Sequence, residues 1–263
     1  MKTFALSQST GAGSPDVAGF FDPRTFSVQY IVSDPATKQC AIIDPVLDFD
    51  EKSGATATFC ADALLTYVEE EGLTVAWILD THPHADHFSA AQYLKEKTGA
   101  PTAIGQYVTQ VQALWKEIYH WPEMPTDGRQ WDTLFVEGDT FAIGELSARV
   151  LHSPGHTLAS ITYVIGDTAF VHDTLFQPDF GTRAPIFPVG MPSLYGTPFS
   201  RFSRCRAIRG CSPATTICPM AVSQRGRAVS MSSEPTTRTW LAKARRSTSP
   251  YATSGIASYP CPS

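Results

Sequence analysis

Short runs of alternating hydrophobic and polar residues near the start of the chain give way to longer apolar runs in its middle. Residues 27–33 alternate and are rich in β-branched and aromatic side chains, which is typical of a strand. Turn residues at 34–39 and an apolar run at 40–45 complete a predicted hairpin. The acidic segment 46–54 that follows is predicted to be a loop.

The middle of the chain alternates between helical and strand patterns. An apolar stripe predicts a helix over 61–71, and Gly72 ends it. Further segments are predicted as strands at 75–80 and 101–105 and helices at 87–98 and 107–119. The second half has strand patterns at 134–136, 140–143, 146–151, 161–165 and 169–171. This order predicts an α/β fold with two sheets packed as a sandwich and helices outside.

The composition is that of a soluble globular protein, with 43% hydrophobic and 17% charged residues. No apolar run approaches the roughly 18–20 residues of a membrane span. The first residues are too few and too polar for a secretory signal, so we expect a cytoplasmic protein. The six cysteines have no C-x-x-C spacing, which predicts free thiols and neither a disulfide framework nor a thiolate zinc site.

Charge is distributed unevenly along the chain. Residues 1–183 carry 10 basic and 24 acidic side chains, whereas residues 184–263 carry 10 basic side chains, one acidic side chain (Glu234) and no histidine. A basic tail can bind nucleic acid. This one contains no recognisable binding module, so we expect neither a nucleic-acid nor a membrane partner.

Three histidines and an aspartate lie within six residues, directly after the predicted strand at 75–80: His82, His84, Asp86 and His87. In an extended chain a spacing of two places His82 and His84 on the same side. Asp86 and His87 follow where the chain is predicted to turn into a helix. Imidazole and carboxylate groups are preferred ligands of zinc and iron, so this segment predicts a metal site.

Two later segments offer further ligands. Gly155 permits a tight turn that presents His156 to the same cavity. Asp173 ends another predicted strand and is a candidate for a carboxylate ligand from a third segment. His172 would alternate away from Asp173 on that strand, and the sequence leaves open whether it is a mere neighbour or supports a ligand.

These motifs, in this order, resemble the metallo-β-lactamase superfamily. Its pattern is H-x-H-x-D-H, then a G-H-T histidine, then an aspartate at a strand end. The resemblance covers roughly residues 20–180 and implies an αββα sandwich. It also implies one metal position at His82, His84 and His156 and a second that includes Asp86 and His87. Asp173 would lie between the two.

Two flanking strings, at 43–54 and 170–182, are similar to the bacterial persulfide dioxygenase group, which includes the β-lactamase-hydrolase-like proteins. This resemblance implies a single iron, Fe(2+), held by the residues His82, His156 and Asp173. His84, Asp86 and His87 would then shape the pocket, and no catalytic residue is predicted beyond the metal site. The implied reaction is oxidation of glutathione persulfide by O₂ to glutathione and sulfite, with the small thiol as partner.

The same residues also suit a hydrolase. A glyoxalase-II-type thioesterase would use a dinuclear zinc or iron site to generate a hydroxide that attacks a thioester carbonyl. The candidate ligands alone do not decide between the two chemistries. The sequence leaves open which metal is bound (iron or zinc), how many ions are bound (one or two) and which thiol is the substrate. It also leaves open whether the protein is a homodimer or has another oligomeric state.

The resemblance stops after residue 182. The family would continue with A-R-A-D-F-P-G-G-D-A and later C-H-D-Y, and neither string is present. When residues 186–192 are back-translated and the reading frame is shifted by one base, permitted codons give the string D-F-P-G-G-D-A. The same shift of residues 211–219 gives L-F-T-C-H-D-Y-M-P. We therefore interpret 1–182 as a metallo-β-lactamase-like domain and 183–263 as the product of a single-base frameshift, in the gene or in its sequencing.

The shifted segment should supply the last sandwich strand and covering helices, and the basic tail has no pattern able to replace them. We expect a tail of low order, exposed apolar surface on the preceding domain, poor folding and weak activity. An inactive product is thus a third alternative to the two enzymes. Resequencing tests this interpretation, and an intact locus without family-like strings in another frame would contradict it.

Overall fold

The computed structural model describes residues 3–174 and 221–223. By its internal contacts the chain divides into Met1–Gly226 and Arg227–Ser263, and every described residue belongs to the first unit. The domain boundary predicted at 182 and nearly all of the predicted tail lie outside the described residues and stay predictions. Within the described part of the chain, no helix has the length and apolar character that crossing a membrane requires.

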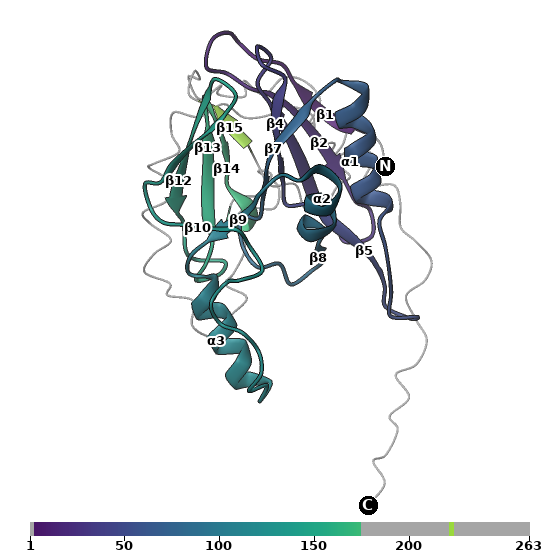
Figure 1. Cartoon of the computed structure of the whole chain (residues 1–263), viewed down its shortest axis with the longest axis vertical. Helices are drawn as coiled ribbons and strands as arrows, with labels where there is room; N and C mark the ends of the chain where they lie inside the picture. The colour runs from purple at the N-terminus through teal and green to yellow at the C-terminus, as the bar shows by residue number, and fades with distance from the viewer. Residues whose placement is uncertain (1–2, 175–220, 224–263) are drawn as a thin grey trace, which may run out of the picture. The chain divides into compact units, whose positions relative to one another are not determined.

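The first sheet has seven strands in the order β1-β2-β3-β4-β7-β9-β10 (Figure 1). Its first four strands pair antiparallel, and β4, β7, β9 and β10 pair parallel. The predicted hairpin is confirmed as β3 and β4, and the predicted strand at 75–80 as β7. The bounds are β1 Thr3–Ser7, β2 Asp16–Phe21, β3 Val28–Ser33, β4 Gln39–Ile43, β7 Thr74–Leu79, β9 Thr102–Gly105 and β10 Thr133–Phe135.

The second sheet is antiparallel, in the order β11-β12-β13-β14-β15. Its bounds are β11 Thr140–Ile143, β12 Leu146–His152, β13 Ile161–Ile165, β14 Thr168–Phe170 and β15 Ala221–Ser223. Strand β15 lies in the predicted tail and adds three residues to the edge of this sheet, although the sequence there has no recognisable strand pattern. Buried residues of the two sheets pack in one cluster, which includes Val32 and Ile43 of the first sheet and Val150 and Tyr163 of the second. The predicted sandwich is therefore confirmed.

Within the described ranges, three helices lie outside the sheets: α1 (Phe59–Glu70), α2 (Ala91–Thr98) and α3 (Val108–Ile118). Figure 1 shows α1 and α2 on the same side of the first sheet. Leu64 of α1 and Leu94 of α2 are fully buried against Ile42 and Ile78. Burying each such side chain contributes about 1.5–3 kcal/mol, so this apolar face holds both helices on the sheet.

Two local predictions were wrong for a shared reason. The segment predicted as an acidic loop contains β5 (Val46–Asp50), which pairs with β6 (Ala55–Ala57) and β8 (Phe88–Ser89). Because Phe88 and Ser89 pair with β5, the helix predicted from residue 87 begins only at Ala91. Long-range strand pairing has overridden the local pattern in both segments.

Two of the six cysteines lie in the described residues, and both are free and buried, as predicted. Burial raises the pKa of the Cys40 and Cys60 thiols to about 12. Because the thiolate is the reactive form, we expect both to resist iodoacetamide at pH 8 in the folded protein and to react once urea unfolds it. Peptide mapping measures this, and rapid native labelling of either cysteine would contradict the packing described.

Candidate metal centre

The predicted ligands meet where strands of both sheets end. His82 and His84 follow β7, His156 follows β12, and Asp173 lies after β14 in the short 3-10 turn η1 (His172–Thr174). The side chains of His82 and His156 are each only 2% exposed, and that of Asp173 is 14% exposed. The structure thus brings together residues that are up to 91 positions apart in the sequence (82 to 173).

His82, His156 and Asp173 form one group, whose ligand atoms lie within 4.8 Å of one another. Oδ2 of Asp173 is 3.3 Å from Nε2 of His156 and 4.0 Å from Nε2 of His82. Donors held by one ion at about 2.1 Å are about 3.0 Å apart at right angles and about 4.2 Å apart when opposite. Nε2 of His82 is also buried without a hydrogen-bond partner among the described residues. Spacing and chemistry both fit a bound metal ion.

A buried carboxylate, Asp44, fixes which nitrogen of His82 faces this group. The Thr81 hydroxyl lies 2.8 Å from Oδ2 of Asp44 and 2.9 Å from Nδ1 of His82. An ionised carboxylate can only accept, so Thr81 donates to Asp44 and accepts from the Nδ1–H of His82. Nε2 of His82 therefore carries the lone pair that a metal requires. Burial lowers the pKa of His82 well below its usual value, and nearby histidines add to this, so the ring stays neutral.

Asp44 reaches this position through the parallel register of β4 and β7. Ile43 pairs with Leu79, so Asp44 and Asp80 leave the sheet side by side. Asp44 adopts the left-handed conformation (φ 51°), which aspartate tolerates better than most residues. Its Oδ1 accepts the Thr81 N–H at 2.7 Å and the His84 Nε2–H at 3.1 Å. One side chain thus orients both His82 and His84.

The charges around Asp44 are mutually stabilising. Burial alone would raise the pKa of the Asp44 carboxyl, but the charge and hydrogen bond of His84 and the hydrogen bonds from Thr81 hold it below its usual value. Burial likewise opposes a charged His84, yet Asp44 and Asp80 raise the pKa of His84 to about 9. Asp44, Asp80 and His84 also form a group of candidate ligands. Neither Asp44 nor Asp80 was predicted as a site residue, although each directly follows an apolar strand.

His84, Asp86 and His87 form a second group within 4.8 Å, beside the first. The rings of His82 and His84 are 4.2 Å apart, as are those of His84 and His87. Oδ2 of Asp86 accepts the Ser27 hydroxyl at 2.6 Å and lies 3.2 Å from Nδ1 of His87. Nε2 of His87 is buried and lacks a hydrogen-bond partner within the described ranges. All six predicted residues therefore lie together, and their roles as ligands or pocket walls stay predictions.

We had expected His172 to lie on a strand. It does not, because β14 ends at Phe170. Its backbone is left-handed (φ 46°), and its Nε2 lies 3.0 Å from Oγ of Ser153. Its ring centroid is 5.4 Å from that of His82. None of the ligand groups found in the described part of the chain includes it. Through Ser153, His172 contacts the segment leading to His156.

Residues 23–209 match the family model of the metallo-beta-lactamase superfamily. The chain belongs to the metallo-β-lactamase superfamily. The order of histidines and aspartates predicted this family, and the sandwich and the clustered ligands agree with it.

Individual proteins of known name or structure are similar to parts of this chain. A β-lactamase hydrolase-like protein of Xylella fastidiosa (strain 9a5c) is 70% identical over 177 residues, 67% of this chain and 41% of that protein. The mitochondrial persulfide dioxygenase ETHE1 of Bos taurus is 28% identical over 65% of this chain and 57% of that protein. The crystal structure of ETHE1 from Myxococcus xanthus has 30% sequence identity and a TM-score of 0.52, over 68% of this chain and 65% of that one. The chain spans less than half the length of the Xylella relative.

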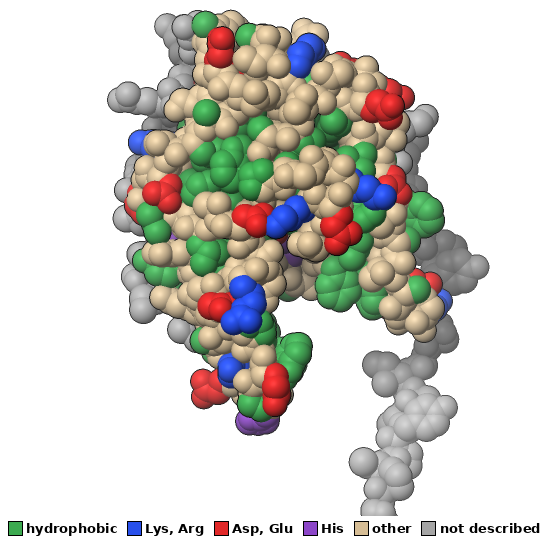
Figure 2. All heavy atoms as spheres, in the orientation of Figure 1, with side chains coloured by type: hydrophobic (Ala, Val, Ile, Leu, Met, Phe, Trp, Pro, Cys, Tyr) green, Lys and Arg blue, Asp and Glu red, His purple; other side chains and the backbone are tan. Residues whose placement is uncertain are grey.

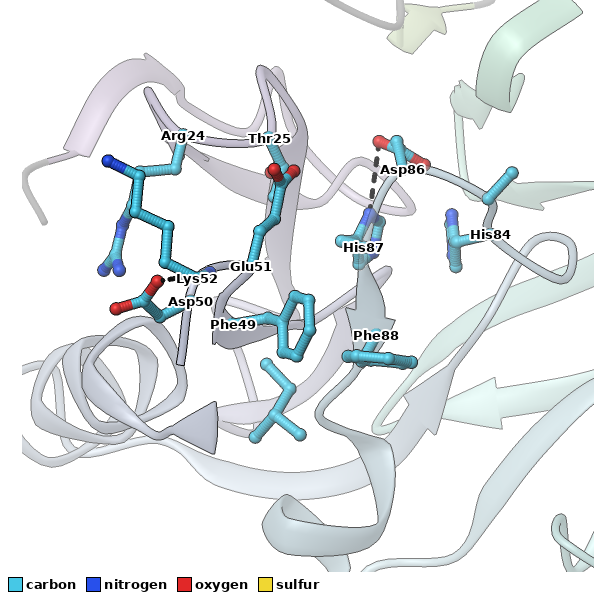
Figure 3. A pocket seen from close by; sticks show the side chains of 12 residues that line it. Arg24, Thr25, Phe49, Asp50, Glu51, Lys52, His84, Asp86, His87 and Phe88 are labelled. Carbon is cyan, nitrogen blue, oxygen red and sulfur yellow. Dashed lines mark hydrogen bonds and ion pairs between the residues drawn. The ribbon is translucent and has the colours of Figure 1, made fainter. Parts of the chain in front are cut away.

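In this superfamily member the second ligand group lines a cleft of about 660 Å³ (Figure 3). The cleft walls come from the β2–β3 turn, strand β5 with the turn after it, and residues 84–88. Figure 2 shows hydrophobic side chains at the surface in the region of β5 and β8. Phe49 and Phe88 are 39% and 53% exposed there. The candidate metal centre therefore adjoins a cleft of the size that binds small molecules.

Proposed function

We propose that this protein is a mononuclear non-haem iron enzyme that oxidises a small-thiol persulfide, glutathione persulfide, with O₂. The observation that carries the proposal is the group of His82, His156 and Asp173. Two histidines and one carboxylate form the ligand set of non-haem iron(II) oxygenases, and zinc is the alternative metal. The similarity to proteins named ETHE1, one of them a persulfide dioxygenase, supports this branch of the superfamily.

The net reaction converts the persulfide, O₂ and water to the thiol and sulfurous acid, GSSH + O₂ + H₂O → GSH + H₂SO₃. The outer sulfur loses four electrons to O₂, gains three oxygens and separates from the inner sulfur as the S–S bond breaks. A bound iron would supply open coordination positions and redox chemistry for this reaction. The chain's own contribution is positional: Asp44, acting through Thr81, keeps Nε2 of His82 directed at the site.

A dinuclear hydrolase is the second candidate. It is favoured by one observation, the adjoining group of His84, Asp86 and His87 with a buried Nε2 on His87. A second ion held there could activate water for attack on a thioester. Nε2 of His84 donates to Asp44, and a histidine ligand commonly donates its other N–H to a carboxylate, so this contact is compatible with both candidates.

Paired assays on one iron-loaded preparation separate the candidates. We expect O₂ uptake with glutathione persulfide, matched one to one by sulfite, and no hydrolysis of S-lactoylglutathione above background. Thioester hydrolysis without O₂ uptake would select the hydrolase. A folded, iron-loaded chain with neither activity would contradict both and favour the inactive product.

A further inference from the structure

His172 stands directly before the candidate ligand Asp173, and the proposed chemistry gives it no part. It belongs to none of the ligand groups found in the described residues, yet it is only 2% exposed. Its backbone is left-handed (φ 46°), a conformation that a residue other than glycine keeps only where its surroundings hold it. Glycine would adopt this backbone at no steric cost, so the role of His172 lies in its side chain.

The side chain of His172 contacts the segment that carries another candidate ligand. Its Nε2 lies 3.0 Å from Oγ of Ser153, and the ring also hydrogen-bonds the Ser153 backbone. Ser153 is the first residue after β12 and stands three positions before His156. Its hydroxyl lies 2.9 Å from Oγ1 of Thr162 on β13, and its N–H donates to the Ser160 carbonyl at 2.9 Å. The partner of His172 is therefore itself held in place by β13 and by the loop of His156.

These contacts join two ligand-bearing segments that the backbone ladder of the sheet does not join. In the second sheet β13 lies between β12 and β14. His156 follows β12 and Asp173 follows β14, yet Oδ2 of Asp173 is only 3.3 Å from Nε2 of His156. The contact of His172 with Ser153 spans this gap one residue before Asp173. The ring of His172 also lies beside both histidines of the group, with its centroid 5.4 Å from that of His82 and 6.4 Å from that of His156.

We propose that His172 is a positioning residue for the metal ligands. Through Ser153 it holds the segment of Asp173 against the segment of His156, so that a carboxylate and an imidazole reach the same ion. The inference rests on the proposed function only in taking Asp173 and His156 as ligands of one ion, and it applies to iron and to zinc alike. His172 is not itself a ligand.

Cobalt(II) titration of the metal-free protein tests this role, because the visible absorption of bound cobalt(II) reports both affinity and ligand geometry. We expect His172→Gly to weaken cobalt(II) binding about 10–100-fold and to change the spectrum, since partners that orient ligands contribute on this scale. Glycine keeps the left-handed backbone, so the loss reports the side chain. His172→Gln, whose amide can reach the Ser153 hydroxyl, should restore most of the affinity and the wild-type spectrum.

The matched control is His120→Gly. His120 is also a left-handed histidine (φ 49°), but it is exposed and lies beyond the end of α3. Its substitution should leave cobalt(II) affinity and spectrum unchanged. Ser153→Ala removes one hydroxyl and should weaken binding by less than His172→Gly, because the backbone contact remains. It should add nothing in the double variant, since both changes break the same contact.

The outcomes separate this role from mere packing. Wild-type affinity and spectrum in folded His172→Gly, or losses that multiply in the double variant, would overturn it. An equal loss in His172→Gln and His172→Gly would assign the effect to packing of the ring and overturn it too. Circular dichroism checks folding. If His172→Gly is unfolded, Ser153→Ala decides alone: weaker binding supports the role, and unchanged binding overturns it.

The same measurements are independent of the oxygenase reaction. The expected cobalt(II) pattern without O₂ uptake by the iron-loaded wild type would support the positioning role and remove the oxygenase. O₂ uptake by the wild type with unchanged cobalt(II) binding in His172→Gly would support the oxygenase and overturn the positioning role.

Discussion

Replacing Asp173 by alanine is expected to abolish iron binding and to lower O₂ uptake with persulfide by at least about 100-fold. Asp173 supplies the only carboxylate of the group with His82 and His156, and its Oδ2 faces Nε2 of both rings. Loss of a residue that merely supports a ligand costs about 10–100-fold, so loss of a ligand should cost more. Metal analysis after anaerobic loading and an oxygen electrode measure the two effects.

The control for this variant is Asp127→Ala. Asp127 is an exposed aspartate whose ion pair is with Arg129. Its removal should leave iron content and O₂ uptake unchanged and stability within about 0.5 kcal/mol. Full iron content in Asp173→Ala would show that the metal is held elsewhere.

Substitutions of Asp44 are expected to reduce both stability and metal affinity, although Asp44 is not a proposed ligand. Asp44→Ala leaves the Thr81 hydroxyl and a charged His84 buried without their acceptor, which should cost about 3–5 kcal/mol. Asp44→Asn keeps the shape and the tolerance for a left-handed backbone but loses the charge. We expect it to lower iron affinity about 10–100-fold, because His82 and His84 are no longer oriented.

Asp34→Asn is the matched control for Asp44→Asn. Asp34 is also a buried, hydrogen-bonded aspartate, but its partners are Thr37, Ala36 and Glu145 in a turn that contains no candidate ligand. It should cost about 1–3 kcal/mol of stability and leave iron affinity unchanged. Urea unfolding and iron titration distinguish the two effects. Equal iron affinity in both variants would contradict the role assigned to Asp44.

The fold could be predicted where the local pattern and the final pairing agree. Strands β3, β4 and β7 alternate or are continuously apolar, and all three lie in the first sheet. β3 and β4 are buried along almost their whole length, and β7 is buried at Ile78 and Leu79, next to the candidate site. The error at 46–54 came from reading acidic residues as solvent-exposed. Asp48 is only 3% exposed and bonds Arg24 and Cys60, contacts that the local sequence does not reveal. Pairing with β5 then determined where α2 begins.

The candidate site could be predicted where its residues form a recognisable motif within a short stretch of sequence. The three histidines after β7 stand out by their spacing, and His156 and Asp173 by their positions after strands. Asp44 and Asp80 were missed because an aspartate after a strand is also a common turn residue. Only the parallel register of β4 and β7 shows that the two lie side by side and face His84.

The most direct test of the central claim is the number of iron ions bound per chain, measured by anaerobic dialysis and metal analysis. The account predicts one ion in the wild type, one in His87→Ala and none in His156→Ala. His120→Ala, at a histidine beyond the end of α3, serves as the control and should match the wild type. Two ions in the wild type and one in His87→Ala would contradict the mononuclear site and establish the second ligand group as a metal position.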